Sequence, residues 1–344
     1  MSALELRLAT ALDRSAWDQF VERMPTAEAT HLWAFGSLIE DCFQLRSYRL
    51  IAERDGQIEG LLPLASQSSF VGRFLTSLPY LNHSGVLSNS PEVREALAQR
   101  ALALGGEVGA QRVEIRGREG ADLPLPVWNG KNGYELELPD DSEVLWTSLR
   151  SKVRAQVKRP RKEGYASRVA DVEALPIFYR LLSQRWHQLG SPILPYRFFE
   201  KFVALFGSQV KLVLVEREGV AAAAGLLLGW RGSVEIPWAA SDFQANRFGV
   251  NMLLYWEALE EAIRSGADRF DFGRSTPGTG NAKFKLQWGA AERALSWNLA
   301  TSGEQGQSAE RGDRKRELVA NTWRRLPRFV VGWLGPHLAA RIPY

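Results

Sequence analysis

The same order of secondary-structure signals occurs twice along this chain of 344 residues. Each copy contains two apolar strands joined by an acidic residue and glycine, then a helix that ends at glycine, then another apolar strand. The first copy places these elements at residues 51–65, 92–104 and 112–115, and the second at 214–228, 249–265 and 269–272. A hairpin, a helix and a strand repeated in one order indicate a duplication, which predicts two similar α/β domains.

Length and composition agree with two folded domains. A chain of this length exceeds one ordinary core, and a hydrophobic content of 45% excludes wholesale disorder. We expect domains at residues 1–148 and 149–319, a loop at 302–312, and a C-terminal helix at 320–344. Further helices are expected at residues 172–189 and 196–206, the second closed by glycine.

Several classes of protein are excluded by residue usage. Cys42 is the only cysteine, so neither an intramolecular disulfide nor a two-cysteine metal site can form. The four histidines show no ligand spacing, so no metal is expected; they are His31, His83, His187 and His337. The N-terminal residues lack the features of a secretory signal, and no apolar run reaches the length of a bilayer span. These observations predict a cytoplasmic protein.

The strongest chemical signal lies near residue 280. Asp271-Phe272-Gly273-Arg274-Ser275 ends a predicted strand, and Phe284-Lys285-Leu286-Gln287-Trp288-Gly289 follows shortly after. Loops after strands often carry the chemistry of α/β folds. Three cations gather here without a packing rationale, which favours a functional site; they are Arg274, Lys283 and Lys285.

A basic helix is expected between the two copies, over residues 150–162. Arg154, Lys158 and Arg161 fall on one face by their spacing of three and four residues. The face could bind an anionic ligand or RNA, or it could simply be solvated, since charge runs usually lie at the surface. Trp238 is expected late in a central strand, where it either lines a substrate channel or packs in the core.

Several motifs together resemble the FemAB-type family of peptidyl or aminoacyl transferases, and most closely its members that accompany exosortase and exopolysaccharide systems. The resemblance covers nearly the whole chain. Its motifs are Ser77-Leu78-Pro79-Tyr80 through Gly85, Trp186 through Pro192, Phe198-Phe199, Tyr255-Trp256-Glu257-Ala258, Asp271 through Ser275, and Phe284-Lys285 with Trp288-Gly289. Residues 33–39 lack the lysine of the cell-wall members, which argues against a UDP-linked muropeptide acceptor.

The resemblance implies an α/β fold of two tandem GNAT-like (acyl-CoA N-acyltransferase-like) domains with a substrate channel between them. The C-terminal helix would pack back on the first domain. An amine would attack an activated ester to form an amide bond, with Lys285 stabilising the oxyanion. Arg274 would hold a phosphate or carboxylate. The remaining substrate contacts would come from Lys283, Trp238 and the basic helix (Arg154, Lys158, Arg161).

The same resemblance bears on the donor. GNAT proteins bind pyrophosphate at a glycine-rich loop before a helix, which corresponds here to Gln244 through Gly249. Arg247 replaces the first glycine of that pattern, so Arg247 and Gly249 form a degenerate coenzyme A loop. We therefore expect no bound cofactor, with aminoacyl-tRNA or acyl-CoA as candidate donor substrates.

The resulting hypothesis is a cytoplasmic transferase that joins an activated acyl donor to an amine of a cell-envelope or exopolysaccharide-related acceptor. Two alternatives remain open: a coenzyme A-dependent N-acyltransferase, and a non-catalytic scaffold for an anionic glycan or lipid-linked precursor. The tail carries Trp323, Phe329 and Trp333 beside arginines. It is expected to dock on the first domain or to contact the inner face of the membrane.

Overall fold

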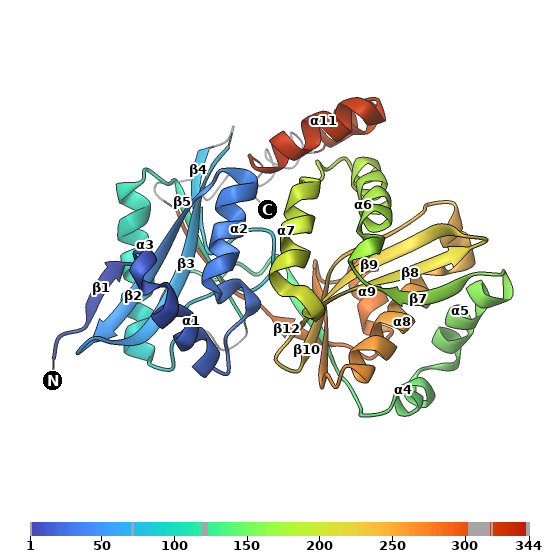
Figure 1. Cartoon of the computed structure of the whole chain (residues 1–344), viewed down its shortest axis with the longest axis horizontal. Coiled ribbons are helices and arrows are strands. Elements are labelled where there is room, and N and C mark those ends of the chain that lie inside the picture. Colours follow the sequence, from blue (N-terminus) through green and yellow to red (C-terminus); the bar gives the residue numbers. More distant parts are fainter. Residues whose placement is uncertain (1, 70–71, 119–122, 302–316, 318, 342–344) are drawn as a thin grey trace. The chain divides into compact units, whose positions relative to one another are not determined.

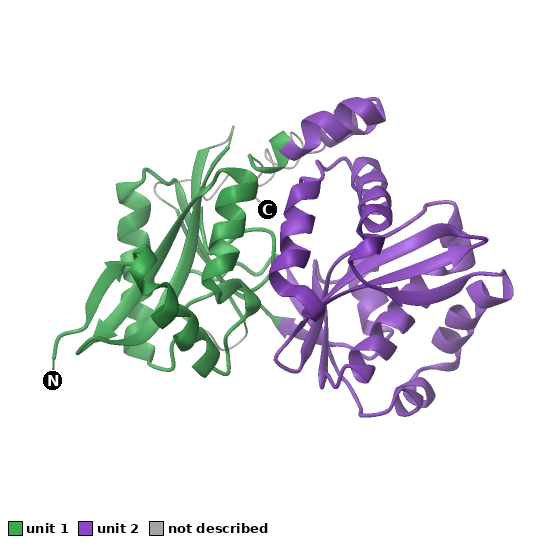
Figure 2. Ribbon diagram, in the orientation of Figure 1, with its two compact units in different colours: residues 1–130, 294–314, 337–344 green, residues 131–293, 315–336 purple. Residues whose placement is uncertain are grey.

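The computed structural model describes residues 2–69, 72–118, 123–301, 317 and 319–341. These residues divide between two compact units, each built from separate stretches of sequence (Figure 2). The first unit comprises the described parts of residues 1–130, 294–314 and 337–344. The second comprises the described parts of residues 131–293 and 315–336.

The first unit is built on a sheet of strand order β1-β2-β3-β4-β5-β13 (Figure 1). Its described strands are β1 (Glu5–Leu8), β2 (Arg46–Arg54), β3 (Gln57–Ser69), β4 (Gly72–Thr76), β5 (Arg112–Gly117) and β13 (Ser296–Thr301). Its described α-helices are α1 (Arg14–Arg23), α2 (Trp33–Phe43) and α3 (Pro91–Glu107). The strands pair antiparallel, except that β4 and β5 run parallel. Leucine, valine and alanine side chains of α3 pack on the sheet and form the core of this unit.

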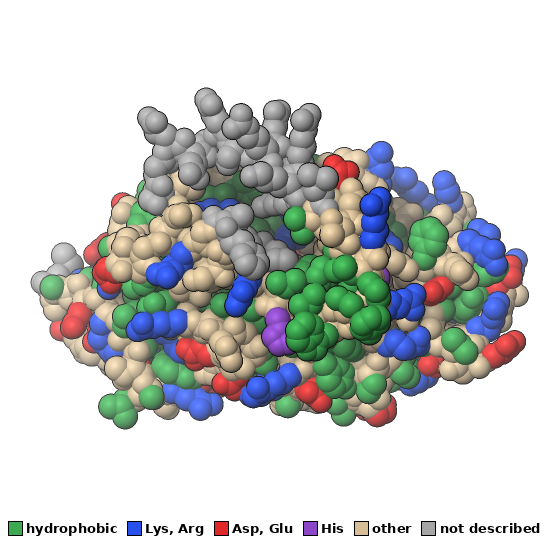
Figure 3. Space-filling view, turned by 90° about the horizontal axis from the view of Figure 1, so that it is seen from above, with side chains coloured by type: hydrophobic (Ala, Val, Ile, Leu, Met, Phe, Trp, Pro, Cys, Tyr) green, Lys and Arg blue, Asp and Glu red, His purple; other side chains and the backbone are tan. Residues whose placement is uncertain are grey.

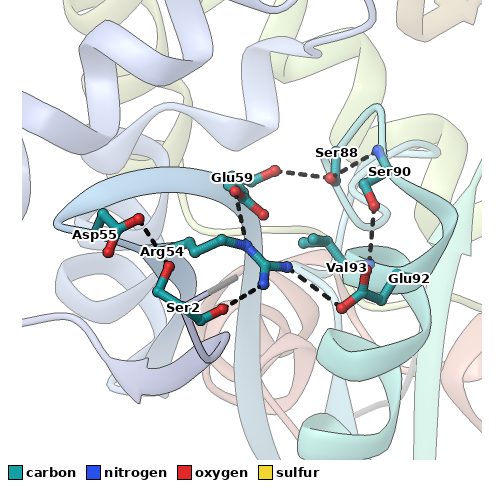
Figure 4. A network of polar contacts seen from close by, with 8 residues as sticks. All are labelled: Ser2, Arg54, Asp55, Glu59, Ser88, Ser90, Glu92 and Val93. Atoms are coloured by element: carbon teal, nitrogen blue, oxygen red, sulfur yellow. Dashed lines mark hydrogen bonds and ion pairs between the residues drawn. The ribbon is translucent and has the colours of Figure 1, made fainter.

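A polar network fixes the hairpin turn of the first unit to the start of α3 (Figure 4). Arg54 forms ion pairs with Glu59 at 3.1 Å and with Glu92 at 3.3 Å. The Ser90 hydroxyl caps α3 by accepting a hydrogen bond from the backbone N–H of Val93. Arg54 and Glu59 belong to the hairpin while Glu92 lies in the first turn of α3, so these contacts join two elements that are separate in sequence.

The second unit repeats this plan on a sheet of order β12-β6-β11-β10-β9-β8-β7. Its described strands are β6 (Asn132–Glu137), β7 (Ala166–Ala170), β8 (Val210–Arg217), β9 (Val220–Trp230), β10 (Ser233–Ser241), β11 (Arg269–Ser275) and β12 (Ala291–Ala294). Its described α-helices are α4 (Ser142–Ser148), α5 (Ser151–Lys162), α6 (Leu175–Leu189), α7 (Tyr196–Phe206), α8 (Val250–Arg264) and α9 (Gly280–Leu286). Helix α11 (Arg328–Ala339) begins in this unit, and its residues after Pro336 group with the first unit. The apolar face of α8 packs on the sheet and supplies much of the core.

The predicted duplication is confirmed by the strand pairing. The hairpins β2–β3 and β8–β9 correspond, as do helices α3 and α8 and strands β5 and β11. In each unit the strand after the long helix runs parallel to the preceding strand of the sheet. In each unit a further strand pairs antiparallel with that strand: β13 in the first unit, and β6 in the second, where β12 lies beyond it. The chain is therefore an α/β protein with two sheets of equivalent topology.

The units differ from the expected domains at their ends. The division falls after residue 130 and not after 148, because β6 pairs with β11 and α4 packs against α8. Conversely, β13 follows the main part of the second unit in the sequence but pairs with β5 of the first unit. Neither β6 nor β13 was predicted from the sequence, so their exchange between the sheets was not expected.

The tail is divided between the two units. Residues 315–336 group with the second unit, although the C-terminal helix was expected on the first domain. Arg324 donates hydrogen bonds to the carbonyls of Gln188 and Leu189, which end α6. Only residues after Pro336 group with the first unit, where the carbonyl of Ala340 accepts a hydrogen bond from Gln67. The expected loop at 302–312 lies outside the described residues.

Candidate functional site

The candidate site lies where strands β10 and β11 of the second unit separate. These parallel strands pair only from Ser233–Arg269 to Glu235–Asp271. Immediately beyond, β10 has a bulge against β9 between Glu235 and Trp238, and β11 has one against β6 between Asp271 and Arg274. Gly273 takes a positive φ of 72° within the second bulge. Bulges redirect side chains and expose backbone groups, so chemistry is often found beside them.

Lys285 reaches this point from helix α9. Thr279 caps the helix, its hydroxyl accepting a hydrogen bond from the N–H of Ala282. The Lys285 side chain is buried, with only 7% of the residue exposed. Its ammonium donates to the carbonyls of Gly273 at 2.8 Å and Arg274 at 2.9 Å, so the lysine is held against the bulged strand.

Burial has the largest effect on the charge of this lysine. Desolvation lowers the pKa of Lys285 from its ordinary value of 10.5 to about 8, and Asp271 and Glu235 oppose the shift through their negative charges. The ammonium also lies 5.4 Å from the centre of the Tyr134 ring. Lys285 is therefore still mostly protonated at neutral pH. Its positive charge is weakly screened, because the side chain is buried away from water.

Asp271, Glu235 and Tyr134 were not among the residues predicted from the sequence. Asp271 is buried and accepts a hydrogen bond from the N–H of Gly273 at 2.7 Å, which shapes the bulge. The Tyr134 hydroxyl donates to Glu292 at 3.0 Å, and burial raises the tyrosine pKa to about 12. An acidic residue inside an apolar strand is a signal that the sequence does carry at positions 235 and 271.

The three predicted cations do not form one cluster. The main chain of Arg274 contacts Lys285, while the arginine side chain is half-buried in β11. Lys283 is exposed on α9. The structure thus brings Arg274 and Lys285 together through a backbone carbonyl, with Lys283 on the solvent side of the same helix.

Two of the three basic residues of helix α5 contact α4. Arg154 donates to the carbonyl of Thr147 at 3.0 Å and to that of Trp146 at 3.4 Å, near the C-terminal end of α4. The ammonium of Lys158 lies 5.5 Å from the centre of the Trp146 ring. Arg161 is exposed, and its positive charge acts on Glu260 of α8. Arg154 therefore stabilises a helix end, which accounts for its position without a ligand.

The degenerate loop before α8 lies directly against α5. Gly249 has a positive φ of 86°, and a Cβ built there would lie 3.2 Å from the carbonyl oxygen of Gln156. Arg247 is exposed, its guanidinium 4.6 Å from the centre of the Phe248 ring. The start of α8 is thus closely approached by helix α5, which limits access to its free N–H groups.

Trp238 has a packing role. Only 6% of this residue is exposed. Its ring meets three phenylalanines of α7 edge-on, with centroid distances of 5.7 Å to Phe198, 5.2 Å to Phe199 and 5.3 Å to Phe202. These contacts agree with the packing interpretation of Trp238, and a substrate contact by this residue stays a prediction.

A separate hollow of about 480 Å³ lies elsewhere in the second unit. It is lined by the end of β6, by α4, and by residues 286–289 after Lys285. Neither Lys285 nor Asp271 belongs to its lining. We place the candidate site at Lys285, because that is where charge, burial and strand geometry coincide.

Other kinds of site find no support in the described part of the chain. Among those residues, no group of histidine, cysteine or acidic side chains is arranged to hold a metal ion. No described helix combines the length and apolar character that crossing a bilayer requires.

Comparisons with known proteins agree with this geometry. Residues 147–286, which include Lys285, match the family model described as an acetyltransferase (GNAT) domain. No curated protein matches the sequence.

Solved structures extend the likeness to the whole chain. The crystal structure of FemX aligns with a TM-score of 0.61 at 14% identity, covering 92% of this chain and 100% of that one. A tandem GNAT protein from the clavulanic acid biosynthesis pathway aligns at 0.55 and 12%, covering 88% and 100%. The C-terminal domain of a putative lysylphosphatidylglycerol synthetase from Agrobacterium fabrum aligns at 0.55 and 12%, covering 91% and 97%. These neighbours share the tandem GNAT fold with this chain.

Proposed function

We propose that this chain, which has a tandem GNAT fold, is a transferase that joins an activated aminoacyl or acyl ester to the amine of a cell-envelope or exopolysaccharide-related acceptor. The observation that carries this proposal is the held ammonium of Lys285. An ammonium has three donors, and two of them go to the carbonyls of Gly273 and Arg274. The third donor is left to bind an oxygen that gains charge during the reaction.

The proposed reaction needs such a donor. Attack of the acceptor amine on the ester carbonyl forms a carbon–nitrogen bond and places negative charge on the carbonyl oxygen. When the tetrahedral intermediate collapses, the carbon–oxygen bond of the ester breaks, the amine loses its proton and the leaving alkoxide gains one. A fixed cation in a dry site stabilises the oxyanion strongly, because it needs no reorganisation as charge develops. Lys285 takes this role, and Arg274 is proposed to hold an anionic group of the donor.

The loop before α8 supports a donor other than coenzyme A. Arg247 stands in place of a glycine, and Gly249 is closely approached by Gln156 of α5. Basic side chains of α5 and of the loop, such as Lys158, Arg161 and Arg247, are exposed in this region. An aminoacyl-tRNA would make use of these charges through phosphate contacts. A putative lysylphosphatidylglycerol synthetase is among the neighbours in fold, which favours an aminoacyl donor over a simple acyl donor.

A coenzyme A-dependent N-acyltransferase is the second candidate. It is favoured by one observation: the family model that matches residues 147–286 is described as an acetyltransferase domain. The two candidates use the same Lys285 site and differ in the donor. A non-catalytic scaffold is the third reading, and it predicts binding without turnover.

A direct assay separates these candidates. The protein is incubated with a mixture of charged tRNAs or with acetyl-CoA, together with a panel of amino sugars and envelope precursors, and amide products are detected by mass spectrometry. The expected result is a product from charged tRNA that is lost in Lys285→Met and kept in Asn281→Ala, a change at an exposed position on the same helix. Product from acetyl-CoA alone would establish the second candidate, and saturable binding of a precursor without any product would establish the scaffold.

A further inference from the structure

Helix α11 at the end of the second unit is buried along one side only. Val331 and Ala339 are almost fully buried, at 3% and 0% exposed. Gly335 lies between them on the same face, and a Cβ built there would lie 3.3 Å from the Ile193 side chain and 3.6 Å from that of Trp323. The spacing of four residues marks this as the docked face of the helix.

The opposite side of α11 exposes two large aromatic residues. Phe329 is 79% exposed and Trp333 is 70% exposed, one helical turn apart. Figure 3 looks onto α11 and shows hydrophobic side chains gathered there at the surface. Large aromatic side chains of a helix are normally turned inward, so two exposed together indicate an interaction surface.

The charged residues of this segment of the chain have a single sign. Residues 321–341 contain no aspartate or glutamate. Exposed arginines lie before and after the two aromatic residues in the sequence; they are Arg324, Arg325, Arg328 and Arg341. A surface with exposed aromatics, a basic border and no acidic residue is complementary to an anionic, partly apolar surface.

We propose that the outer face of α11 (Phe329, Trp333 and Arg328), together with Arg325 just before the helix, binds the surface of a membrane that contains anionic lipid. The aromatic rings enter the interfacial region, where an amphipathic ring is favoured, and the arginines meet lipid phosphates. The docked face with Val331 and Gly335 stays on the protein, so the helix lies in the plane of the interface. This inference concerns membrane attachment and does not depend on the acyl-transfer chemistry proposed at Lys285.

The test is flotation of the full chain with vesicles. Binding is compared on vesicles of phosphatidylcholine alone and with 30% phosphatidylglycerol. The double variant Phe329→Ser/Trp333→Ser is expected to lower the partition coefficient about tenfold or more, through loss of buried apolar area. Arg325→Gln/Arg328→Gln is expected to lose about tenfold or more on anionic vesicles only, and binding of the unaltered chain is expected to weaken as salt rises.

Matched controls come from the same chain. Phe243 is 69% exposed on another loop, so Phe243→Ser controls for general loss of an exposed phenylalanine. Arg23→Gln/Arg293→Gln removes two exposed arginines elsewhere. Thermal midpoints of all variants verify folding.

Three results would overturn the proposal. The first is no binding of the folded protein to anionic vesicles. The second is an equal loss from the control variants. The third is a change of oligomeric state in Phe329→Ser/Trp333→Ser without a change in vesicle binding, because this would make the face a protein interface. Quenching of Trp333 fluorescence by brominated lipid, measured as the difference from Trp333→Phe, is the direct positive result.

Discussion

Glu114 of the first unit and Asp271 of the second occupy the same position in their sheets. Each lies on the strand after the long helix, and each is the last residue in register with the parallel neighbour: Glu114 with Thr76, and Asp271 with Glu235. Both are buried. The duplicated fold therefore places one buried carboxyl group at each point where parallel strands separate.

The cation beside each carboxyl group differs. Arg116 lies two residues after Glu114 on the same strand, and its Nε donates to Glu114 at 2.6 Å. The guanidinium also lies 4.5 Å from the centre of the Trp297 ring. Lys285 of the second unit comes from a separate helix and contacts backbone carbonyls. In the first unit, Arg116 is thus bound to a carboxylate within the core. In the second unit, the ammonium of Lys285 is bound to two backbone carbonyls and has a third N–H donor.

The first prediction concerns the role of Lys285. Lys285→Met is expected to lower turnover roughly 10²–10³-fold, the effect of losing one oxyanion donor. It is also expected to lower the free energy of unfolding by about 1–3 kcal/mol, because two carbonyls lose their buried donor. Product assays and urea denaturation measure the two effects, with Asn281→Ala as control. Unchanged turnover in a folded Lys285→Met protein would remove the lysine from the mechanism.

The second prediction follows from the lowered pKa of Lys285. Between pH 8 and 10.5 the unfolded chain still holds a proton that the native state has released, so the lysine makes stability rise with pH across this window. Activity should change in the opposite sense: the ammonium stabilises the oxyanion only when protonated, so kcat/KM should fall as pH rises through about 8. Urea midpoints against pH for the unaltered chain and Lys285→Met check the first effect. A pH–rate profile flat up to pH 10 would contradict the second.

The third prediction concerns the close contact of α5 with the start of α8. Gly249→Ala puts a side chain at a positive φ, which costs about 1–2 kcal/mol, and also 3.2 Å from the Gln156 carbonyl. Gly266→Ala is the matched control, since Gly266 has a φ of 77° and nothing within 4 Å of its added Cβ. Gly249→Ala should therefore be the more destabilising of the two by urea denaturation. Equal losses would mean that the contact with α5 contributes nothing.

The fourth prediction assigns Arg154 to the stability of α4. Arg154→Ala removes hydrogen bonds to the Trp146 and Thr147 carbonyls and is expected to cost about 0.5–1.5 kcal/mol. Amide hydrogen exchange at residues 142–149 should accelerate, while Arg159→Ala, at an exposed position of α5, should leave it unchanged. If Arg154→Ala weakens donor binding without altering exchange, the residue is a ligand contact as its sequence position alone suggested.

The fifth prediction concerns the buried pair of the first unit. Arg116→Met removes the closer of the two arginines that form ion pairs with Glu114, leaving Arg112 at 3.3 Å, and is expected to destabilise the chain by up to about 3–5 kcal/mol. Arg116→Met/Glu114→Leu removes both charges and should recover much of that loss. If the double variant is no more stable than Arg116→Met, the loss of stability does not come from leaving the Glu114 charge without its partner.

The repeated fold was predictable because its signals are local. Turn glycines such as Gly56 and Gly219 and the apolar runs beside them identify each hairpin, and both glycines do take positive φ. The partners of the outer strands were not predictable in this way. Neither β6 nor β13 was predicted as a strand, and the choice between two similar sheets depends on contacts across the whole fold.

The candidate site was predicted in part. The sequence singled out Lys285 and Arg274, and the structure brings them together. It did not show that Lys285 is buried, since a lysine usually lies at the surface. Trp238 had two interpretations in the sequence, and the α7 phenylalanines that favour packing are distant from it in sequence, so their contact could not be foreseen.

The exchange of outer strands affects how the chain is made. Strand β5 ends at Gly117, but its neighbour β13 begins only at Ser296. On a ribosome that adds about 5–20 residues per second, β5 waits on the order of ten seconds or more for that partner. Until then its open backbone edge can pair with another nascent chain. The first unit, although synthesised first, is completed last.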